Sequence, residues 1–171
     1  MALLASYDIV FQEVPGEVTL ALNLSGCPNR CPGCHSPHLR EAAGEPLDEE
    51  LLDGLLARYG GSVTCVAFMG GDGEPAVVGR LAARVKATGL KTAWYSGREN
   101  LSPEVCLDNL DYVKIGPYDP ARGGLSTPGT NQRFYRVEGP AGDRRMVDAT
   151  ALFLRNNGPG PTDPGGSARL G

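Results

Sequence analysis

The sequence predicts an α/β fold in which helices alternate with the strands of a parallel sheet. Apolar, partly β-branched runs at residues 18–24, 63–69 and 90–95 have the length and composition of buried strands. Stretches with apolar residues at helical spacing separate these runs. Such alternation with short connections is typical of right-handed βαβ units, and 171 residues suffice for one domain with a core.

The first third of the chain contains two candidate strands and one candidate helix. Residues 7–13 alternate loosely and favour an edge strand, whereas residues 18–24 predict a stronger strand that leads into a cysteine-rich loop. The helix begins after Asp48, with Pro46 before it, acidic residues in its first turn and a glycine pair at its end. Its apolar residues at helical spacing are Leu51, Leu52, Leu55, Leu56 and Tyr59.

The rest of the chain continues the alternation and then loses it. Residues 63–69 are almost continuously apolar, as in a strand buried on both faces. The following predicted elements are a helix over residues 77–85, a strand over 90–95, a short helix over 103–107, a strand over 112–115 and a hairpin of 133–137 with 144–147. Residues 156–171 are rich in Pro, Gly and Ser, which predicts a disordered tail after one domain of residues 1–155.

Ligands of parallel sheets gather at the carboxyl ends of the strands. Four polar or glycine-rich segments fall at predicted strand ends: the cysteine loop, Gly70-Gly71-Asp72, Ser96-Gly97 and Gly116-Pro117. We therefore expect them to lie together and to form the functional site. Lys114 and Arg98 could contact the cofactor or the partner, but the default expectation for both is a solvated surface charge.

Composition excludes several classes of function. The net charge is −4 and no basic stretch alternates with aromatic residues, so nothing favours a nucleic-acid partner. No apolar run approaches the roughly 20 residues of a membrane helix. The opening residues 1–8 lack the basic start and the cleavage signal of a secretory leader, which favours a cytoplasmic protein without a membrane partner.

Three of the five cysteines crowd into one short loop, as Cys27, Cys31 and Cys34. A secreted disulfide framework usually has an even number of cysteines at wider spacing, so the cluster indicates metal ligands. Thiolates are the usual ligands of iron–sulfur clusters, and three ligands on a four-iron cubane leave one iron open for a small molecule. Cys65 and Cys106 are expected to be ordinary cysteines, with the role of a fourth cluster ligand as the open alternative for either.

The stretches around this loop resemble a known family. Cys-x₃-Cys-x₂-Cys after a first strand is similar to the radical S-adenosylmethionine superfamily. Residues 31–36, 65–72, 94–98 and 130–136 resemble the activating proteins of anaerobic ribonucleoside-triphosphate reductase. Together these stretches span most of the chain before the tail.

The resemblance implies a fold, two cofactors and a reaction. The fold would be a small, incomplete parallel (β/α) barrel. A [4Fe–4S] cluster would bind S-adenosylmethionine, cleave it reductively and so generate a glycyl radical on the large subunit of anaerobic ribonucleoside-triphosphate reductase, with an electron donor such as flavodoxin. The implied metal ligands are Cys27, Cys31 and Cys34, the implied cofactor-binding residues are Gly33, Cys34, His35, Gly70, Gly71 and Asp72, and no catalytic residue is implied beyond the cluster ligands.

The glycine pair suits a cofactor contact, because Gly70 and Gly71 let a backbone carbonyl approach the methionine amine. A nearby carboxylate favours the positive charge of that amine; both Asp72 and Glu74 are available, and Asp72 has the favoured position. Two alternatives to the reductase activase stay open. One is a radical S-adenosylmethionine enzyme with another substrate, including another glycyl-radical enzyme, and the other is a zinc-binding interaction module with a Cys₃His site completed by His35 or His38.

Overall fold

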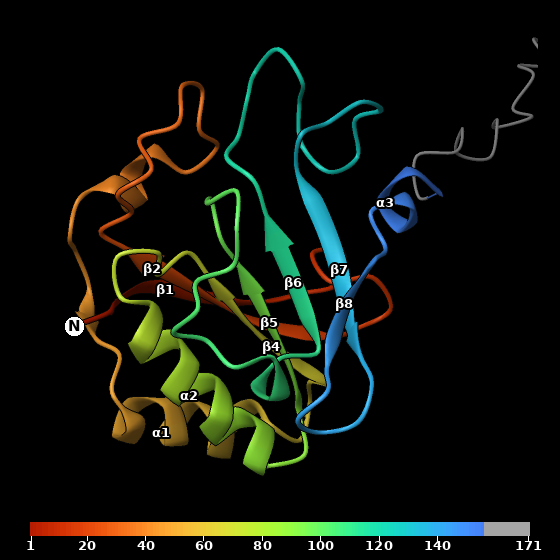
Figure 1. Ribbon diagram of the computed structural model, residues 1–171. Helices are drawn as coiled ribbons and strands as arrows, with labels where there is room; N and C mark the ends of the chain where they lie inside the picture. Colours follow the sequence, from red (N-terminus) through yellow and green to blue (C-terminus); the bar gives the residue numbers. More distant parts are fainter. Residues whose placement is uncertain (156–171) are drawn as a thin grey trace, which may run out of the picture.

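A computed structural model describes residues 1–155, so the predicted tail of residues 156–171 lies outside the described residues. The described chain forms one eight-stranded sheet with helices (Figure 1). The strand order is β3-β1-β2-β4-β5-β6-β7-β8. The strands are β1 (Leu3–Val10), β2 (Thr19–Ser25), β3 (Glu45–Pro46), β4 (Cys65–Met69), β5 (Lys91–Tyr95), β6 (Tyr112–Ile115), β7 (Arg133–Glu138) and β8 (Arg145–Asp148).

The centre of the sheet is parallel and its flanks are antiparallel. Strands β2, β4, β5 and β6 pair in parallel, whereas β1, β3, β7 and β8 pair with their neighbours antiparallel. A short turn can join antiparallel strands only, because a parallel pair needs a crossover of a dozen or more residues. The prediction of an α/β domain around parallel strands is therefore confirmed, as is the predicted hairpin of β7 with β8, whereas the other antiparallel pairs are additions to it.

Two helices cover one face of the sheet. They are α1 (Glu49–Tyr59) and α2 (Pro75–Ala87), which lie next to each other along the sheet in Figure 1. The side chain of Asp48 caps α1 by accepting a hydrogen bond of 2.8 Å from the backbone N–H of Leu51. Beneath the helices lies the main core, whose largest fully buried members include Leu20, Leu22, Leu24, Phe68, Leu81 and Trp94.

The other face of the sheet carries a smaller core. Alternation along the strands turns Cys65, Ala67, Ala93 and Phe134 to this face, where the turn residue Val14 packs on them. A short helix, α3 (Ala151–Arg155), adds two partly buried apolar side chains, Leu152 and Phe153. Apolar side chains therefore cover the middle of this second face of the sheet.

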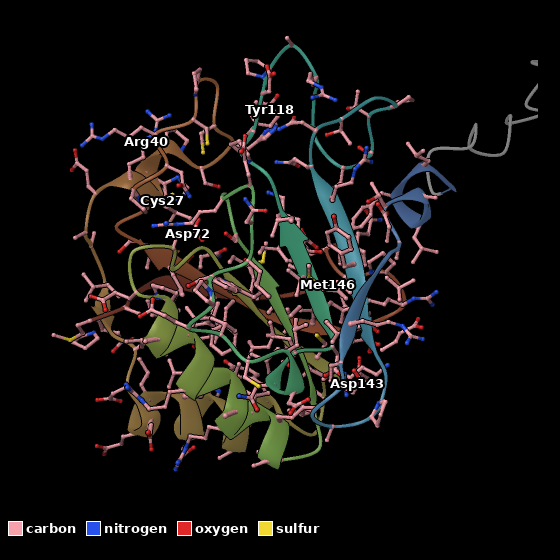
Figure 2. All side chains as sticks on the ribbon, viewed as in Figure 1. Cys27, Arg40, Asp72, Tyr118, Asp143 and Met146 are labelled. Carbon is pink, nitrogen blue, oxygen red and sulfur yellow. The ribbon has the colours of Figure 1, made fainter. Side chains whose placement is uncertain are left out.

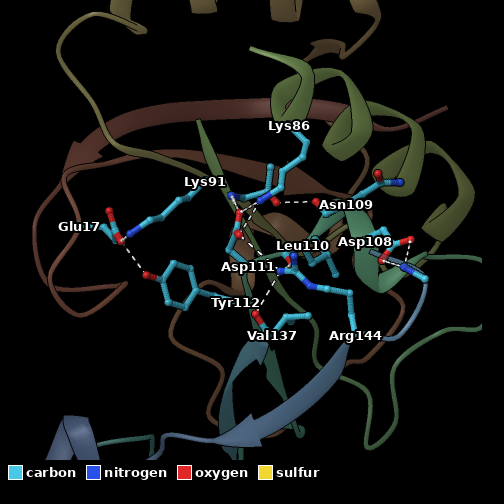
Figure 3. Close-up of polar contacts among 12 residues, drawn as sticks. Glu17, Lys86, Lys91, Asp108, Asn109, Leu110, Asp111, Tyr112, Val137 and Arg144 are labelled. Carbon is cyan, nitrogen blue, oxygen red and sulfur yellow. Dashed lines mark hydrogen bonds and ion pairs between the residues drawn. The ribbon is translucent and has the colours of Figure 1, made fainter. Parts of the chain in front are cut away.

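Ion pairs and hydrogen bonds tie the amino ends of the parallel strands (Figure 3). Glu17, just before β2, is 7% exposed and accepts three hydrogen bonds, from the ammonium of Lys91 and, at 2.6 Å each, from the hydroxyls of Thr64 and Tyr112. Burial alone raises the pKa of Glu17, but these hydrogen bonds outweigh it and leave the pKa below its usual value. The amino end of the sheet is thus closed by a satisfied carboxylate.

A second carboxylate at the same end fixes β6 to its surroundings. Asp111 accepts hydrogen bonds from the backbone N–H of Thr92 at 2.9 Å and from the ammonium of Lys86 at 2.5 and 2.6 Å. The guanidinium of Arg144 lies 3.6 Å away and also donates to the carbonyls of Leu110 and Val137. These contacts join α2, β5, β6 and the β7–β8 turn.

Most predicted elements lie within a few residues of their expected positions, but two predictions were wrong. The first strand spans Leu3–Val10 rather than residues 7–13, and it is not an edge strand because β3 pairs with Leu3 and Leu4 on its outer side. The helix expected at 103–107 is instead a turn followed by a 3₁₀ helix at Leu107–Asn109. Val105 is buried against α2 at Gly79, where the absence of a side chain leaves room for this turn.

Two short elements, β3 and α3, were not predicted from the sequence. They have two and five residues, and neither is long enough to show a period. Within residues 1–155, no helix has the length and apolar character needed to cross a membrane.

The packing of α2 on the sheet predicts a stability difference between two adjacent residues. Leu81→Ala empties a fully buried position, so the free energy of unfolding should fall by about 3 kcal/mol. Arg80→Ala on the solvent side of the same helix removes only an exposed ion pair with Glu49 and should cost less than about 1 kcal/mol. Urea unfolding of both variants under reducing conditions tests this; equal losses would contradict the assigned helix face.

Candidate functional site

The carboxyl ends of the parallel strands carry a pocket of about 360 Å³. Its floor is one row of residues in register across four strands, each at or near the strand end: Asn23, Met69, Tyr95 and Lys114. The cysteine loop and the connection between β6 and β7 form its walls. Other lining residues are Leu24, Cys27, Asn29, Arg30, Cys31, Cys34, His35, Ser36, Leu39, Arg40, Gly70, Tyr118, Gly124, Leu125 and Gln132.

The structure brings all three cysteines of the loop to this one pocket. Local hydrogen bonds fold the loop: the N–H of Cys27 donates to the carbonyl of Leu39 at 3.0 Å, and the N–H of Cys34 donates to the carbonyl of Cys31 at 3.3 Å. Positive φ angles at Gly26 (75°) and Gly33 (66°) allow the chain to turn just before Cys27 and just before Cys34. The three thiols are half-buried, while Cys106 is exposed and Cys65 lies buried in β4.

The pKa of each thiol affects whether it can bind a metal, because the thiolate is the form that binds. Burial is the main cause that raises the pKa of the Cys27 thiol, and negative charge on Asp72, Cys31 and Cys34 adds to it. A cationic group at the site is therefore needed to favour the thiolates that bind metals. Burial likewise raises the pKa of Cys65 to about 12, so that thiol stays neutral.

The spacing of the thiols also bears on the kind of metal group. Among residues 1–155, no three His, Cys, Asp or Glu side chains are grouped closely enough to hold a metal ion as they stand. A single tetrahedral ion requires its ligands within about 2.0–2.3 Å of one point. The thiolate sulfurs of a cubane are farther apart, because each thiolate binds a different iron atom. The three cysteines line one pocket, and thiolate is a ligand type that both kinds of metal group accept.

Asp72 is not among the residues that line the pocket; Figure 2 labels it below Cys27 in the view. It is 1% exposed, and its carboxylate accepts hydrogen bonds from Ser96 Oγ at 2.6 Å, from Gly97 N at 2.8 Å and from Asn29 Nδ2. The guanidinium of Arg98 donates to its backbone carbonyl at 2.9 Å. Asp72 therefore ties the cysteine loop to the end of β5.

Glu74, the other acid considered from the sequence, has a different environment. It is about half exposed at the start of α2 and pairs with the amino terminus of Met1. The two acids of the same turn thus point to different places: Asp72 into the protein under the cysteine loop and Glu74 towards solvent. Which of them serves a cofactor stays a prediction, but only Asp72 contacts a residue of the pocket wall, Asn29.

The glycine pair has two distinct environments. Gly70 lines the pocket, and its carbonyl accepts a hydrogen bond of 2.8 Å from the indole N–H of Trp94. Gly71 lies outside the lining with φ = 86°, and a Cβ there would stand 2.6 Å from Val78 Cγ2 and 2.8 Å from Leu24 Cδ1. Gly71 is thus required by packing, whatever the pocket binds.

The connection between β6 and β7, residues 116–132, packs on the cysteine loop. The ring of Tyr118 meets that of His35 edge to face with centroids 4.6 Å apart. A Cβ on Gly33 would lie 3.5 Å from both Tyr118 and Pro120, so Gly33 sits under this connection rather than in the pocket lining. Figure 2 shows Tyr118 at the same end of the molecule as Cys27.

Three cations line the pocket, and the default expectation for one of them was wrong. Lys114 was expected at the solvated surface, but its ammonium lies in the pocket and donates to the carbonyls of Gly116 at 2.8 Å and Ser96 at 3.4 Å. Burial lowers its pKa to about 8, although Asp72 and the three thiols act in the opposite direction. The position of Lys114 in the alternating pattern of β6 was the feature of the sequence that could have predicted the direction of its side chain. Arg30 and Arg40 complete the set.

A wider groove of about 780 Å³ adjoins the pocket. The two share Asn29, Arg30, Cys31 and Tyr118 in their walls. The rest of the groove is formed mainly by the segment after β5, residues 97–103. The site can therefore accept an elongated ligand that starts at the cysteines and continues along that segment.

Comparisons with known proteins bear on this site. A protein family described as a 4Fe-4S single cluster domain matches residues 14–119, which is more than half of the chain. The matched segment runs from the turn before β2 to the connection after β6 and includes the whole cysteine loop. No curated protein and no solved structure matches the chain.

The buried ammonium of Lys114 predicts a pH-dependent stability. Its pKa is about 8 in the folded chain and about 10.5 when exposed, so between these values the unfolded chain binds the extra proton and stability rises with pH. Lys114→Met removes this titration. The stability of the variant relative to the wild-type apoprotein should therefore fall by about 1 kcal/mol between pH 7 and pH 9.

Anaerobic urea unfolding at several pH values measures this difference. Arg80→Met is the matched control, because an arginine stays charged throughout this range and its difference from the wild type should stay level. A level difference for Lys114→Met as well would show that the ammonium is hydrated in the folded chain.

Proposed function

Because the chain belongs to the family of 4Fe-4S single cluster domains, we propose that Cys27, Cys31 and Cys34 hold one [4Fe–4S] cluster and leave its fourth iron open for S-adenosylmethionine. The observation that carries this proposal is the arrival of all three thiols at one pocket. Three protein ligands on four irons leave one iron without a protein ligand. A ligand with adjacent amino and carboxylate groups can chelate that iron, as a substrate fills the open position of a catalytic zinc site.

The charges of the pocket support an anionic group beside the thiols. Arg30, Arg40 and Lys114 line it, and none of the described lining residues is Asp or Glu. Thiolates around a cluster and the carboxylate of S-adenosylmethionine both carry negative charge, so a cationic wall favours them. The adjoining groove of about 780 Å³ has room for the nucleoside part of the same molecule.

The chemistry belongs to the bound cofactors. The reduced cluster would supply the electron that cleaves S-adenosylmethionine to methionine and a 5′-deoxyadenosyl radical, which then takes a hydrogen atom from a glycine. The protein positions the groups: Asp72 holds the cysteine loop against β5, and the Tyr118–His35 contact covers one side of the loop. Covering the site in this way limits the access of water to a reactive intermediate.

The glycine is proposed to belong to the large subunit of anaerobic ribonucleoside-triphosphate reductase, which makes this chain its activase. Support comes from the sequence likeness of residues 31–36, 65–72, 94–98 and 130–136 to such activating proteins. The three cysteines are only half-buried, so a loop of a partner protein could reach them from solvent. An incomplete (β/α) barrel around β2, β4, β5 and β6, a flavodoxin-like electron donor and a cytoplasmic setting belong to the same proposal.

Removal of single cysteines tests the cluster ligands. Cys27→Ala, Cys31→Ala and Cys34→Ala should each lose most of the iron and at least about 100-fold of the S-adenosylmethionine cleavage, because a cubane with two protein ligands is poorly held. Cys106→Ala is the matched control and should keep about four irons, since that thiol is exposed and lies outside the pocket. Iron analysis and 5′-deoxyadenosine formation after anaerobic reconstitution measure both. A colourless wild-type protein with one tightly bound zinc would overturn the proposal in favour of the Cys₃His module.

The partner is tested separately by electron paramagnetic resonance. The reduced, loaded protein with S-adenosylmethionine and the reductase large subunit should produce a glycyl radical signal, and Cys31→Ala should produce none. Formation of 5′-deoxyadenosine without a glycyl signal would retain the radical chemistry and reject the reductase as the substrate.

A further inference from the structure

Arg40 reaches back nine residues to the cysteine loop. It ends the 3₁₀ helix Pro37–Arg40, and one terminal nitrogen of its guanidinium donates a hydrogen bond to the backbone carbonyl of Cys31. The side chain lines the same pocket as the three thiols. Figure 2 labels Arg40 and Cys27 at the same end of the molecule.

The inner nitrogen of this guanidinium is buried without a partner. Within residues 1–155, Nε of Arg40 is one of the few buried side-chain nitrogen or oxygen atoms that make no hydrogen bond. Leaving a charged donor buried and unpaired is costly, so buried donors in native proteins nearly always find an acceptor. A pocket group that brings acceptor atoms, such as cluster sulfur or thiolate sulfur, would provide it.

The other two cations of the pocket differ from Arg40 in this respect. The ammonium of Lys114 already donates to two backbone carbonyls. Arg30 is exposed, so water screens its charge. Arg40 therefore combines a permanent charge, partial burial and a free N–H in the pocket wall.

We propose that Arg40 is a positioning residue that raises the reduction potential of the cluster, through its charge and through the N–H at Nε. The inference rests on the proposed function, because it needs a cluster on Cys27, Cys31 and Cys34. Reduction takes one electron from an external one-electron donor and adds one negative charge to the cluster. A nearby guanidinium stabilises this more negative state, and hydrogen bonds to the sulfurs and net charge are known determinants of cluster potentials.

A redox titration of the reconstituted full-length protein tests the role of Arg40. Arg40→Gln removes the charge, and at a fixed potential the ratio of reduced to oxidised cluster should fall about tenfold, which corresponds to a potential about 59 mV lower. Arg58→Gln makes the same change of net charge on exposed α1 and should leave the ratio unchanged. Arg40→Lys keeps the charge without the Nε–H and should shift the ratio about threefold in the same direction.

The outcomes separate this inference from the proposed function. A wild-type protein that assembles no four-iron cluster overturns both. A cluster of normal iron content whose potential in Arg40→Gln equals that of Arg58→Gln overturns the inference alone and leaves the ligand assignment standing. If Arg40→Gln cannot hold the cluster, the potential of Arg40→Lys decides, and an unshifted value rejects the proposal.

Discussion

The parallel register of β2, β4, β5 and β6 determines where every group of the site lies. Asn23, Met69, Tyr95 and Lys114 form the pocket floor because they are paired across neighbouring strands. A slip of one residue in any of these strands would exchange a floor residue for a neighbour that faces the helices. The apolar face beneath α1 and α2 prevents such a slip, since its leucines and aromatic residues are fully buried only in this register. Packing far from the pocket thus sets the pocket floor.

A buried carboxylate lies at each end of the sheet, and the two have different structural roles. At the amino ends, Glu17 joins β2 to β5 and β6 by accepting from Lys91 and Tyr112, which closes that end. At the carboxyl ends, Asp72 accepts from Asn29, Ser96 and Gly97 and so fastens a loop instead of closing the sheet. Burial of a carboxylate is unfavourable unless hydrogen-bond donors satisfy it, and each of these two carboxylates accepts from three donors. The position of the cysteine loop therefore depends on the exits of β4 and β5.

Periodicity was sufficient to predict the elements that bury a continuous apolar face. Strands β2, β4, β5 and β6 and helices α1 and α2 belong to this group, and their order gave the parallel centre of the sheet. The pairing of β3 with β1 could not be predicted, because two residues show no pattern and their partner is remote in sequence. For Lys114 the wrong one of two alternatives was preferred: a charge on a strand was assigned to solvent by default, although the alternation of the strand places it beside Tyr95. Arg40 gave no signal, since its contact with Cys31 depends on how the loop folds.

The groups that line the pocket are electrostatically unbalanced in two ways. Burial keeps the Cys27 thiol protonated, while Arg40 and Lys114 bring positive charge into the same space with no carboxylate in the described lining to balance it. An anionic cluster with thiolate ligands would relieve both conditions at once, because the iron favours the thiolate form and the cations favour the resulting negative charge. Ligand affinity and loop folding would then be coupled, as in other sites whose ligands must lose protons to bind. The same positive charges would also favour the reduced cluster, so assembly of the site and its readiness for reduction would have one physical origin.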